Sequence, residues 1–228
     1  MKPRTATKKI NKNNLITKID PKSLISEDFR VIRTNIDYSR IDSQYKSIMI
    51  TSPEPNSGKS VVSANLAVVF AQQGKSTLLI DGDLRKSSVQ YFFPEVRSAG
   101  LTALLTGRIS LEEAIEETEV KNLFVLPAGF ISTNPAELLS SKKMKELFKR
   151  LLTMYEQIII DTPPILAVAD AQIISSLVDG TILVFRSGYT SKTNAKKSVH
   201  VLQQVHGKII CSILNDHKNK KDAYYYGK

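Results

Sequence analysis

Residues 52–60, SPEPNSGKS, set the architecture of this 228-residue chain. They follow the apolar run SIMITS (47–52) directly and precede VVSANLAVVFAQQ (61–73), which is apolar almost all round. A β-branched run, a turn ending in GKS and a helix are the context of a phosphate-binding loop (P-loop). In such a loop, backbone N–H groups wrap the phosphates, Lys59 reaches the terminal phosphates and the Ser60 hydroxyl ligates Mg²⁺.

The loop departs from the usual glycine pattern at two positions. Pro53 stands where the first glycine is usual, and Asn56 stands where another is common. Asn tolerates positive φ, so the turn remains feasible. The stretch expected to bind ATP comprises Asn56, Ser57, Gly58, Lys59, Ser60 and Val61. Asn215, just past the last predicted strand, is suited either to hydrogen-bonding adenine or to forming a turn.

Short apolar runs recur along the chain, and helical patterns follow them. Their β-branched, nearly uninterrupted apolarity is typical of strands that are covered on both faces. The alternation with helices predicts an α/β fold with a doubly wound, mostly parallel sheet, as in P-loop NTPases. The predicted strands are 47–52, 76–81, 122–127, 157–162, 180–185 and 207–214.

Carboxylates follow two of these strands. LLIDGDLRK places Asp81 and Asp83 where one strand ends, and IIIDTPP places Asp161 at the end of another. Ligands gather at the carboxyl ends of parallel strands, so we expect all three aspartates to converge on the P-loop. Mg²⁺ takes one or two carboxylates with phosphates and water, which makes Ser60 and Asp161 the first candidate ligands. Capping of the following segment is the structural alternative for each aspartate.

The formal charge is +10, from 32 Lys and Arg against 22 Asp and Glu. Residues 1–22 hold seven of the basic residues and one Asp, and we interpret them as a basic arm that is solvated or contacts a membrane surface or partner. The chain shows no basic recognition helix and no basic stripe with aromatics, so no nucleic-acid partner is expected. The lack of a signal peptide and of about 20 consecutive apolar residues predicts a cytoplasmic protein.

The chain becomes polar after Asn215 and ends DHKNKKDAYYYGK. This composition predicts a flexible tail over residues 216–228, after a folded domain over residues 23–215. Three aromatic residues in the tail have no core to join: Tyr224, Tyr225 and Tyr226. They are candidate phosphoacceptors or, because Tyr is enriched at interfaces, an anchor on a partner.

The motifs SPEPNSGKS, LLIDGDLRK and IIIDTPP, with EDFRVIRTNI upstream and a terminal YYYG, resemble the bacterial tyrosine kinases of capsule and exopolysaccharide synthesis. The resemblance extends over essentially the whole chain. It implies an ATP- and Mg²⁺-dependent protein tyrosine kinase, with LLIDGDLRK as a variant Walker A motif, that phosphorylates its C-terminal tyrosines in trans. It would regulate polysaccharide synthesis and export.

The resemblance also implies roles for single residues. Lys59 and Ser60 would serve the phosphates and metal, with Asp161 as a metal ligand and Asp83 near the metal. Asp81 would be the base that accepts the tyrosine proton, or else a partner of a metal-bound water. For Arg85, a role in phosphate contact or subunit coupling follows only from its position in the variant motif.

The resemblance further implies a ring of subunits. A helix expected at about 26–37 carries Glu27, Arg30 and Arg33 at positions i, i+3 and i+6 and would dock between subunits. The alternative is that Glu27 and Arg30 pair within the helix. Other implied partners are a transmembrane adaptor, which recruits the kinase to the inner face of the membrane and stimulates it, and a tyrosine phosphatase.

Two other functions fit part of the pattern. Partitioning or septum-placing ATPases of the same superfamily carry a lysine early in the loop that crosses into the partner's site. Glu54 stands there instead, and its negative charge near phosphate disfavours that chemistry. A nucleotide-gated scaffold without phosphoryl transfer fits all features except the tyrosine tail and Asp81.

Overall fold

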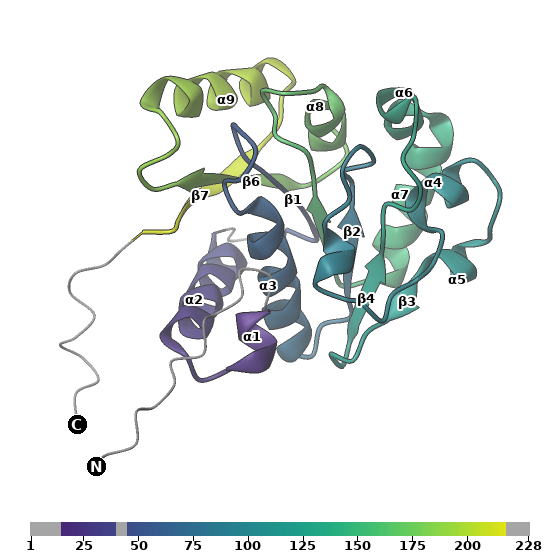
Figure 1. The fold of residues 1–228 in the computed structure, drawn as a ribbon, viewed down its shortest axis with the longest axis horizontal. Coiled ribbons are helices and arrows are strands. Elements are labelled where there is room, and N and C mark those ends of the chain that lie inside the picture. Colours follow the sequence, from purple (N-terminus) through teal and green to yellow (C-terminus); the bar gives the residue numbers. More distant parts are fainter. Residues whose placement is uncertain (1–14, 40–44, 218–228) are drawn as a thin grey trace, which may run out of the picture.

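The structure, a computed structural model, describes residues 15–39 and 45–217 (Figure 1). Within these ranges the strands form one seven-stranded sheet in the order β3-β4-β2-β5-β1-β6-β7. Neighbouring strands run parallel except for β3, a two-residue strand antiparallel to β4 that the sequence pattern did not predict. The strands are β1 (Ser47–Thr51), β2 (Thr77–Asp81), β3 (Glu116–Glu117), β4 (Leu123–Leu126), β5 (Gln157–Asp161), β6 (Gly180–Arg186) and β7 (Ile209–Asn215).

Helices cover both faces of the sheet. One face packs against α1, α2 and α3, and the other against the helices from α4 to α9. The helices are α1 (Ile16–Ile19), α2 (Leu24–Tyr38), α3 (Lys59–Gln72), the 3-10 helix η1 (Val89–Tyr91), α4 (Gly100–Leu105), α5 (Leu111–Ala114), α6 (Pro135–Ser140), α7 (Lys142–Met154), α8 (Asp170–Ser175) and α9 (Lys192–Gln204). In the described part of the chain, none of them combines the length and apolarity needed to span a bilayer.

The uninterrupted apolar strands follow from this two-sided cover. Successive side chains of a strand point to opposite faces, so every position of a central strand needs an apolar residue. In β1, Ile48 and Ile50 pack into the core that contains Phe70 of α3, whereas Met49 packs into the core that contains Phe148 of α7. The predicted doubly wound, mostly parallel fold is confirmed.

Part of the predicted basic arm belongs to the fold. Leu15 is 3% exposed, and α1 packs against α3. Thr17 donates from its backbone N and its Oγ1 to Asn65 Oδ1 of α3, at 3.1 and 2.8 Å. The expectation of an arm up to residue 22 is therefore wrong for this segment, because its apolar and polar groups both find partners on α3. Residues 1–14 lie outside the described residues.

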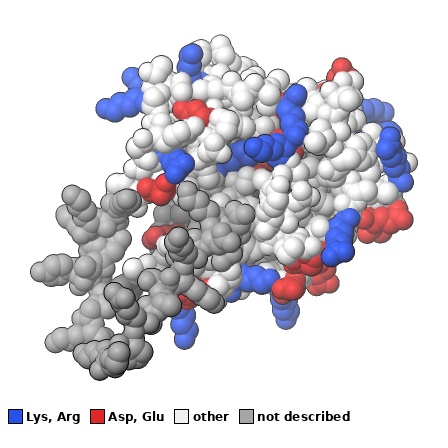
Figure 2. Space-filling view, viewed as in Figure 1, with Lys and Arg blue, Asp and Glu red and all other residues white. Residues whose placement is uncertain are grey.

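The described residues are nearly balanced in charge, with 22 Lys and Arg and 20 Asp and Glu. Most of the formal excess therefore belongs to residues 1–14, 40–44 and 218–228. On the face in Figure 2, basic and acidic side chains are interspersed over several elements.

Candidate functional site

The P-loop joins the end of β1 to the start of α3. Asn56 and Gly58 have positive φ values of 62° and 88°, as expected for an Asn in place of a glycine. A Cβ atom on Gly58 would lie 2.0 Å from Asn215 Nδ2, so a larger residue would displace the Asn215 amide in addition to straining the backbone. The first N–H groups of a helix lack intrahelical partners, and those of α3 therefore suit an anionic ligand. The geometry fits the phosphates of a nucleotide.

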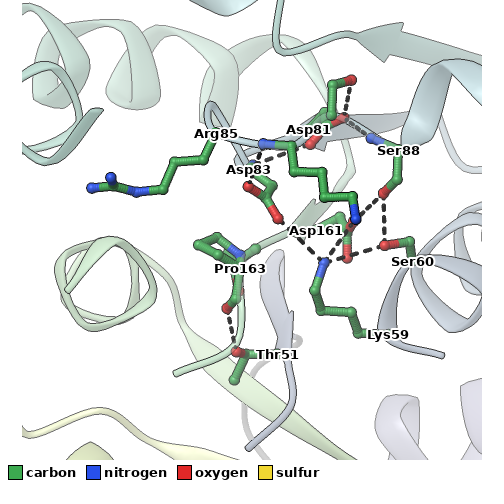
Figure 3. Close-up of polar contacts among 12 residues, drawn as sticks. Thr51, Lys59, Ser60, Asp81, Asp83, Arg85, Ser88, Asp161 and Pro163 are labelled. Atoms are coloured by element: carbon green, nitrogen blue, oxygen red, sulfur yellow. Dashed lines mark hydrogen bonds and ion pairs between the residues drawn. The ribbon is translucent and has the colours of Figure 1, made fainter. Parts of the chain in front are cut away.

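The Lys59 ammonium lies among acidic groups (Figure 3). Its Nζ is 3.5 Å from Asp161 Oδ2 and 3.7 Å from Asp83 Oδ2, and it donates to Ser60 Oγ at 3.2 Å. Burial alone would lower the pKa of Lys59, but the nearby aspartates outweigh this and raise it above its usual value. The amine is therefore a cation, held at the point where the P-loop and two strand ends meet.

Asp161 ends β5 and is fully buried. Its Oδ1 accepts a hydrogen bond from Ser63 Oγ at 3.0 Å, and its Oδ2 is 3.4 Å from Ser88 Oγ. Ser88 Oγ in turn donates to Ser60 Oγ at 2.8 Å. Sequence reasoning missed both serines. The i, i+4 spacing from Lys59 is a signal for Ser63, which places it one turn further along α3, whereas Ser88 follows no comparable pattern.

Asp81 ends β2, and the segment that follows folds back onto it. Its Oδ2 accepts hydrogen bonds from Ser87 Oγ at 2.7 Å and from the next two backbone N–H groups at 3.1 and 3.2 Å. Its Oδ1 accepts from the Asp83 N–H at 3.1 Å. Burial and then the charge of Asp161 raise the pKa of Asp81 to about 6, although these hydrogen bonds act to lower it. Asp81 is thus a buried carboxylate whose charged form is disfavoured by burial and by the negative charge of Asp161.

Asp83 and Arg85 diverge although they lie in one motif (Figure 3). Burial raises the pKa of Asp83 against the opposing charge of Lys59. Arg85 points away from that cluster and donates from Nε and Nη2 to the two carboxylate oxygens of Asp170, at 2.9 and 3.1 Å. Asp170 is fully buried at the start of α8. In this structure Arg85 ties the variant motif to α8, and it also lines the second of the two hollows described below.

Two hollows meet at the P-loop and share Asn56, Gly58 and Val61. The first has a volume of about 500 Å³ and is also lined by Arg186, Asn215 and Asp216. The second, of about 400 Å³, has a polar end that contains Lys59, Ser60 and Asp83. Its apolar residues include Pro163, Pro164, Ala167, Val168 and Tyr91.

Asn215 holds the end of β7 against the P-loop. Its Nδ2 donates to the Ser57 carbonyl at 3.0 Å, and because a carbonyl oxygen only accepts, this bond sets the orientation of the amide. Arg186 closes the same side of the first hollow by binding Asp216 Oδ2 at 3.0 and 2.9 Å and the Asn56 carbonyl at 3.2 Å. The Asn215 Oδ1 is left to accept from another donor.

Glu54 is engaged outside the cluster around Lys59. Its Oε1 accepts from Asn194 Nδ2 at 2.8 Å, and its Oε2 accepts from Thr190 Oγ1 at 3.4 Å. The acidic side chain that replaces the lysine of the partitioning ATPases is therefore held at the start of α9.

The three α2 residues that were expected to dock between subunits, Glu27, Arg30 and Arg33, make different contacts. Arg30 Nη1 donates to Glu27 Oε2 at 2.5 Å, and Arg30 also bonds the Pro21 carbonyl. Arg33 Nη1 donates to the Val69 carbonyl of α3 at 3.0 Å, and its buried Nε has no partner in the structure. Within one chain, the intrahelical pair of Glu27 and Arg30 forms. Tyr224, Tyr225 and Tyr226 lie outside the described residues.

The donor set fits Mg²⁺ shared with phosphates. Among the described residues, no group of three His, Cys, Asp or Glu side chains is placed to hold a metal by itself. Mg²⁺ in nucleotide sites is usually bound by one or two carboxylates together with phosphates and water. Ser60 Oγ and the Asp161 carboxylate, with Asp83 alongside, match that requirement.

Together, the fold and this site define a nucleotide-binding protein of the P-loop class. A family model described as an AAA domain matches residues 45–217. The tyrosine-protein kinase YwqD of Bacillus subtilis (strain 168) is 50% identical over 212 residues, which cover 93% of this chain and 90% of YwqD. The crystal structure of the chimerical protein CapA2B2 superimposes with a TM-score of 0.87 at 40% identity over 90% of each chain. The chain therefore belongs to the AAA-domain family and, within it, to the bacterial tyrosine-protein kinases, as the sequence resemblance predicted.

A septum site-determining protein shares the same fold at a greater distance. MinD from Pyrococcus horikoshii, solved with Mg-ADP, superimposes with a TM-score of 0.63 at 28% identity, over 74% of this chain and 69% of MinD. The fold is thus common to both classes that the sequence suggested, whereas the higher identity to YwqD places this chain with the kinases.

Proposed function

We propose that this chain transfers the γ-phosphoryl group of ATP to tyrosine hydroxyls with the help of Mg²⁺, and that Tyr224, Tyr225 and Tyr226 of a neighbouring copy are among its acceptors. The observation that carries the proposal is the second hollow, whose polar end at Lys59 and Asp83 adjoins apolar residues. Phosphoryl transfer needs mainly positioning and charge neutralisation, which the polar end supplies. A phenol ring suits the apolar part.

The nucleotide would extend across both hollows. In this arrangement the base occupies the first hollow, where Asn215 Oδ1 accepts from the adenine amino group, a donor that guanine lacks at that position. The phosphates follow the shared loop residues Asn56, Gly58 and Val61 into the second hollow. Lys59, held near the strand-end carboxylates, contacts the terminal phosphates.

Mg²⁺, when bound, supplies positive charge against the phosphate oxygens. Ser60 and Asp161 would hold it, with Asp83 beside them. The acceptor oxygen forms a bond to the γ-phosphorus as the bond between that phosphorus and the β–γ bridging oxygen breaks, and ADP leaves. The hydroxyl proton passes to a carboxylate, because tyrosine with its usual pKa of about 10 is a weak nucleophile while protonated.

Two carboxylates compete for the role of base. We assign it to Asp81, because its pKa of about 6 makes it a better proton acceptor than an ordinary aspartate, while Asp83 already faces Lys59. Asp81 must then release one of the hydrogen bonds from the segment that begins at Ser87. Asp83 is the alternative, because it lines the second hollow. Loss of transfer in Asp83→Asn with intact Mg²⁺-ATP binding would move the assignment to Asp83.

The tyrosine tail is proposed to act between subunits. Tyr224 lies seven positions after His217, which limits its reach from that point to roughly 25 Å. The preceding residue, Asp216, lines the first hollow, whereas the acceptor would enter the second. To reach the second hollow of its own chain, the tail would have to turn back around the P-loop. If the tail enters the second hollow of a neighbouring copy, this turn is not needed.

A surface on α2 supports assembly into a ring. Leu24, Val31 and Tyr38 are exposed and recur every seven residues, so they lie along one side of the helix. Exposed apolar surface of this kind favours a protein contact. Glu27 and Arg30 on the same helix would set its specificity through charge.

Regulation of capsular or exopolysaccharide synthesis and export is proposed from the family relationship, as are a transmembrane adaptor, recruitment to the inner face of the membrane and a tyrosine phosphatase. Incubating the purified chain with Mg²⁺ and labelled ATP, with and without the cytoplasmic segment of a candidate adaptor, tests the adaptor. A higher rate with that segment supports it, and an unchanged rate contradicts it.

The deciding experiment mixes two complementary chains. One carries Lys59→Met and an intact tail, and the other is active but has Phe at positions 224, 225 and 226. Mass spectrometry then locates phosphate after addition of Mg²⁺-ATP. Phosphate on the tail of the Lys59→Met chain supports transfer between subunits. An unmodified tail, with activity of the other chain confirmed on a tyrosine peptide, contradicts transfer in trans, and absence of any transfer contradicts the kinase proposal itself.

A further inference from the structure

Tyr91 is an exposed aromatic side chain on the segment that follows Asp81 and Asp83. It ends η1 and is 64% exposed, whereas Val89 at the start of η1 is fully buried. The Val89 N–H donates to Asp81 Oδ2 at 3.2 Å, and the Tyr91 N–H donates to the Ser88 carbonyl at 3.2 Å. Two anchors therefore fix the backbone that presents the Tyr91 ring at the rim of the second hollow.

The apolar side of that hollow contains two successive prolines. Pro163 and Pro164 line it, and the Pro163 carbonyl accepts a hydrogen bond from the buried Thr51 hydroxyl at 2.9 Å (Figure 3). Proline rings have few conformations, so this wall does not need to be ordered when a ligand binds. Tyr91 and the two prolines line the same hollow as Asp83 and Lys59.

We infer that Tyr91 binds the acceptor: the ring of the incoming tyrosine packs against Tyr91 and the Pro163–Pro164 wall, and its hydroxyl then reaches the carboxylates. The inference rests on the proposed function and specifies how the acceptor is selected. Aromatic pairs prefer offset or edge-to-face packing and add binding energy beyond the area they bury. Serine and threonine carry the hydroxyl close to the backbone and gain nothing from this contact.

This arrangement separates acceptor binding from nucleotide binding. Tyr91 belongs to the second hollow only, whereas the three residues common to both hollows lie in the P-loop. Loss of the ring should therefore change the KM for the acceptor and leave the KM for ATP unchanged. Because packing uses the ring and not its hydroxyl, Tyr91→Phe should behave as wild type.

The test uses the full chain with Phe at positions 224–226, so that the tail does not compete, and a synthetic peptide of residues 222–228, DAYYYGK, as the acceptor. We expect Tyr91→Ala to raise the peptide KM roughly tenfold, the scale of a lost aromatic pair with its buried area. Tyr91→Phe should retain the wild-type value. Phe130→Ala is the matched control, because it removes another exposed aromatic ring that lines neither hollow.

A second acceptor sharpens the readout. This acceptor is the same peptide with Ser in place of each Tyr, and Tyr91→Ala should not change its residual rate of phosphorylation. The preference of the enzyme for Tyr over Ser should therefore be smaller in Tyr91→Ala than in the parent. An unchanged peptide KM in Tyr91→Ala would overturn the inference. So would phosphate on Tyr91 together with loss of peptide phosphorylation in Tyr91→Phe, because Tyr91 would then act as a modification site. If the parent enzyme phosphorylates no tyrosine at all, the proposed function fails first.

Discussion

Asp81 and Asp161 occupy paired positions in the register of β2 and β5, at the carboxyl ends of two neighbouring parallel strands. Both carboxylates are fully buried. Burial is the largest cause of the raised pKa of Asp81, and the negative charge of Asp161 is the second. The Lys59 ammonium lies 3.5 Å from Asp161 Oδ2. The pairing concentrates negative charge where a phosphate-bound cation is expected, at a cost to the stability of the fold.

This cost gives stability a pH dependence. The pKa of Asp81 is raised from 3.8 to about 6 on folding, so the folded state binds more protons than the unfolded state between these values. The contribution of Asp81 to the free energy of unfolding therefore falls as pH rises through this window, by roughly 3 kcal/mol for two pKa units. Asp81→Asn should flatten this fall in melts from pH 4 to 7.5 without nucleotide or metal. Parallel curves for the two proteins would show that Asp81 is not the titrating group.

Gly58 is predicted to be essential for nucleotide binding. Gly58→Ala would place a Cβ 2.0 Å from Asn215 Nδ2, in addition to straining a residue at φ 88°. Gly74→Ala is the matched control, because Gly74 has φ 98° but no atom within 4 Å of its would-be Cβ. Both variants should lose roughly 1–2 kcal/mol of stability to backbone strain. In ATP titrations by calorimetry only Gly58→Ala should lose affinity; equal affinities would exclude the Asn215 contact as a determinant.

Asp161 is expected to serve Mg²⁺-dependent ATP binding, and Asp81 is expected to serve phosphoryl transfer. Asp161→Asn removes a proposed Mg²⁺ ligand and should weaken Mg²⁺-dependent ATP binding by about tenfold or more. Asp81→Asn should retain binding but lower the rate of transfer by about 100-fold or more, the scale of a lost general base. ATP titration and a single-turnover assay on each variant measure the two effects. Equal losses of ATP affinity in both variants would show that the assignment is wrong.

A charge swap on α2 distinguishes its two interpretations. The double variant Glu27→Arg, Arg30→Glu keeps an ion pair at i, i+3 but reverses the charges that a neighbouring subunit would meet. The melting temperature should therefore stay close to that of the parent, while light scattering reports smaller species and autophosphorylation falls. Arg33 is left in place because it bonds the Val69 carbonyl within its own chain. An unchanged assembly would leave only the intrahelical pair.

The sequence alone determined the features that contiguous residues encode. A strand, the turn SPEPNSGKS and a helix define the P-loop locally, and Asn and Gly are residue types that permit the positive φ values found at positions 56 and 58. Asp81 and Asp161 were predictable because a parallel sheet brings all strand ends to one edge. The alternation of strands and helices determined the sheet in the same way, although the two-residue β3 was too short to leave a pattern.

Only the tertiary structure decided which polar side chains bind each other when they lie far apart in the sequence. Arg85 binds Asp170, 85 residues away, and Glu54 binds Asn194, 140 residues away. Thr17 donates a hydrogen bond to Asn65, and this contact attaches part of the predicted basic arm to the folded domain. The physical reason is that a local motif limits backbone shape, whereas the choice among distant partners depends on the packing of whole helices against the sheet, where most buried polar groups form hydrogen bonds.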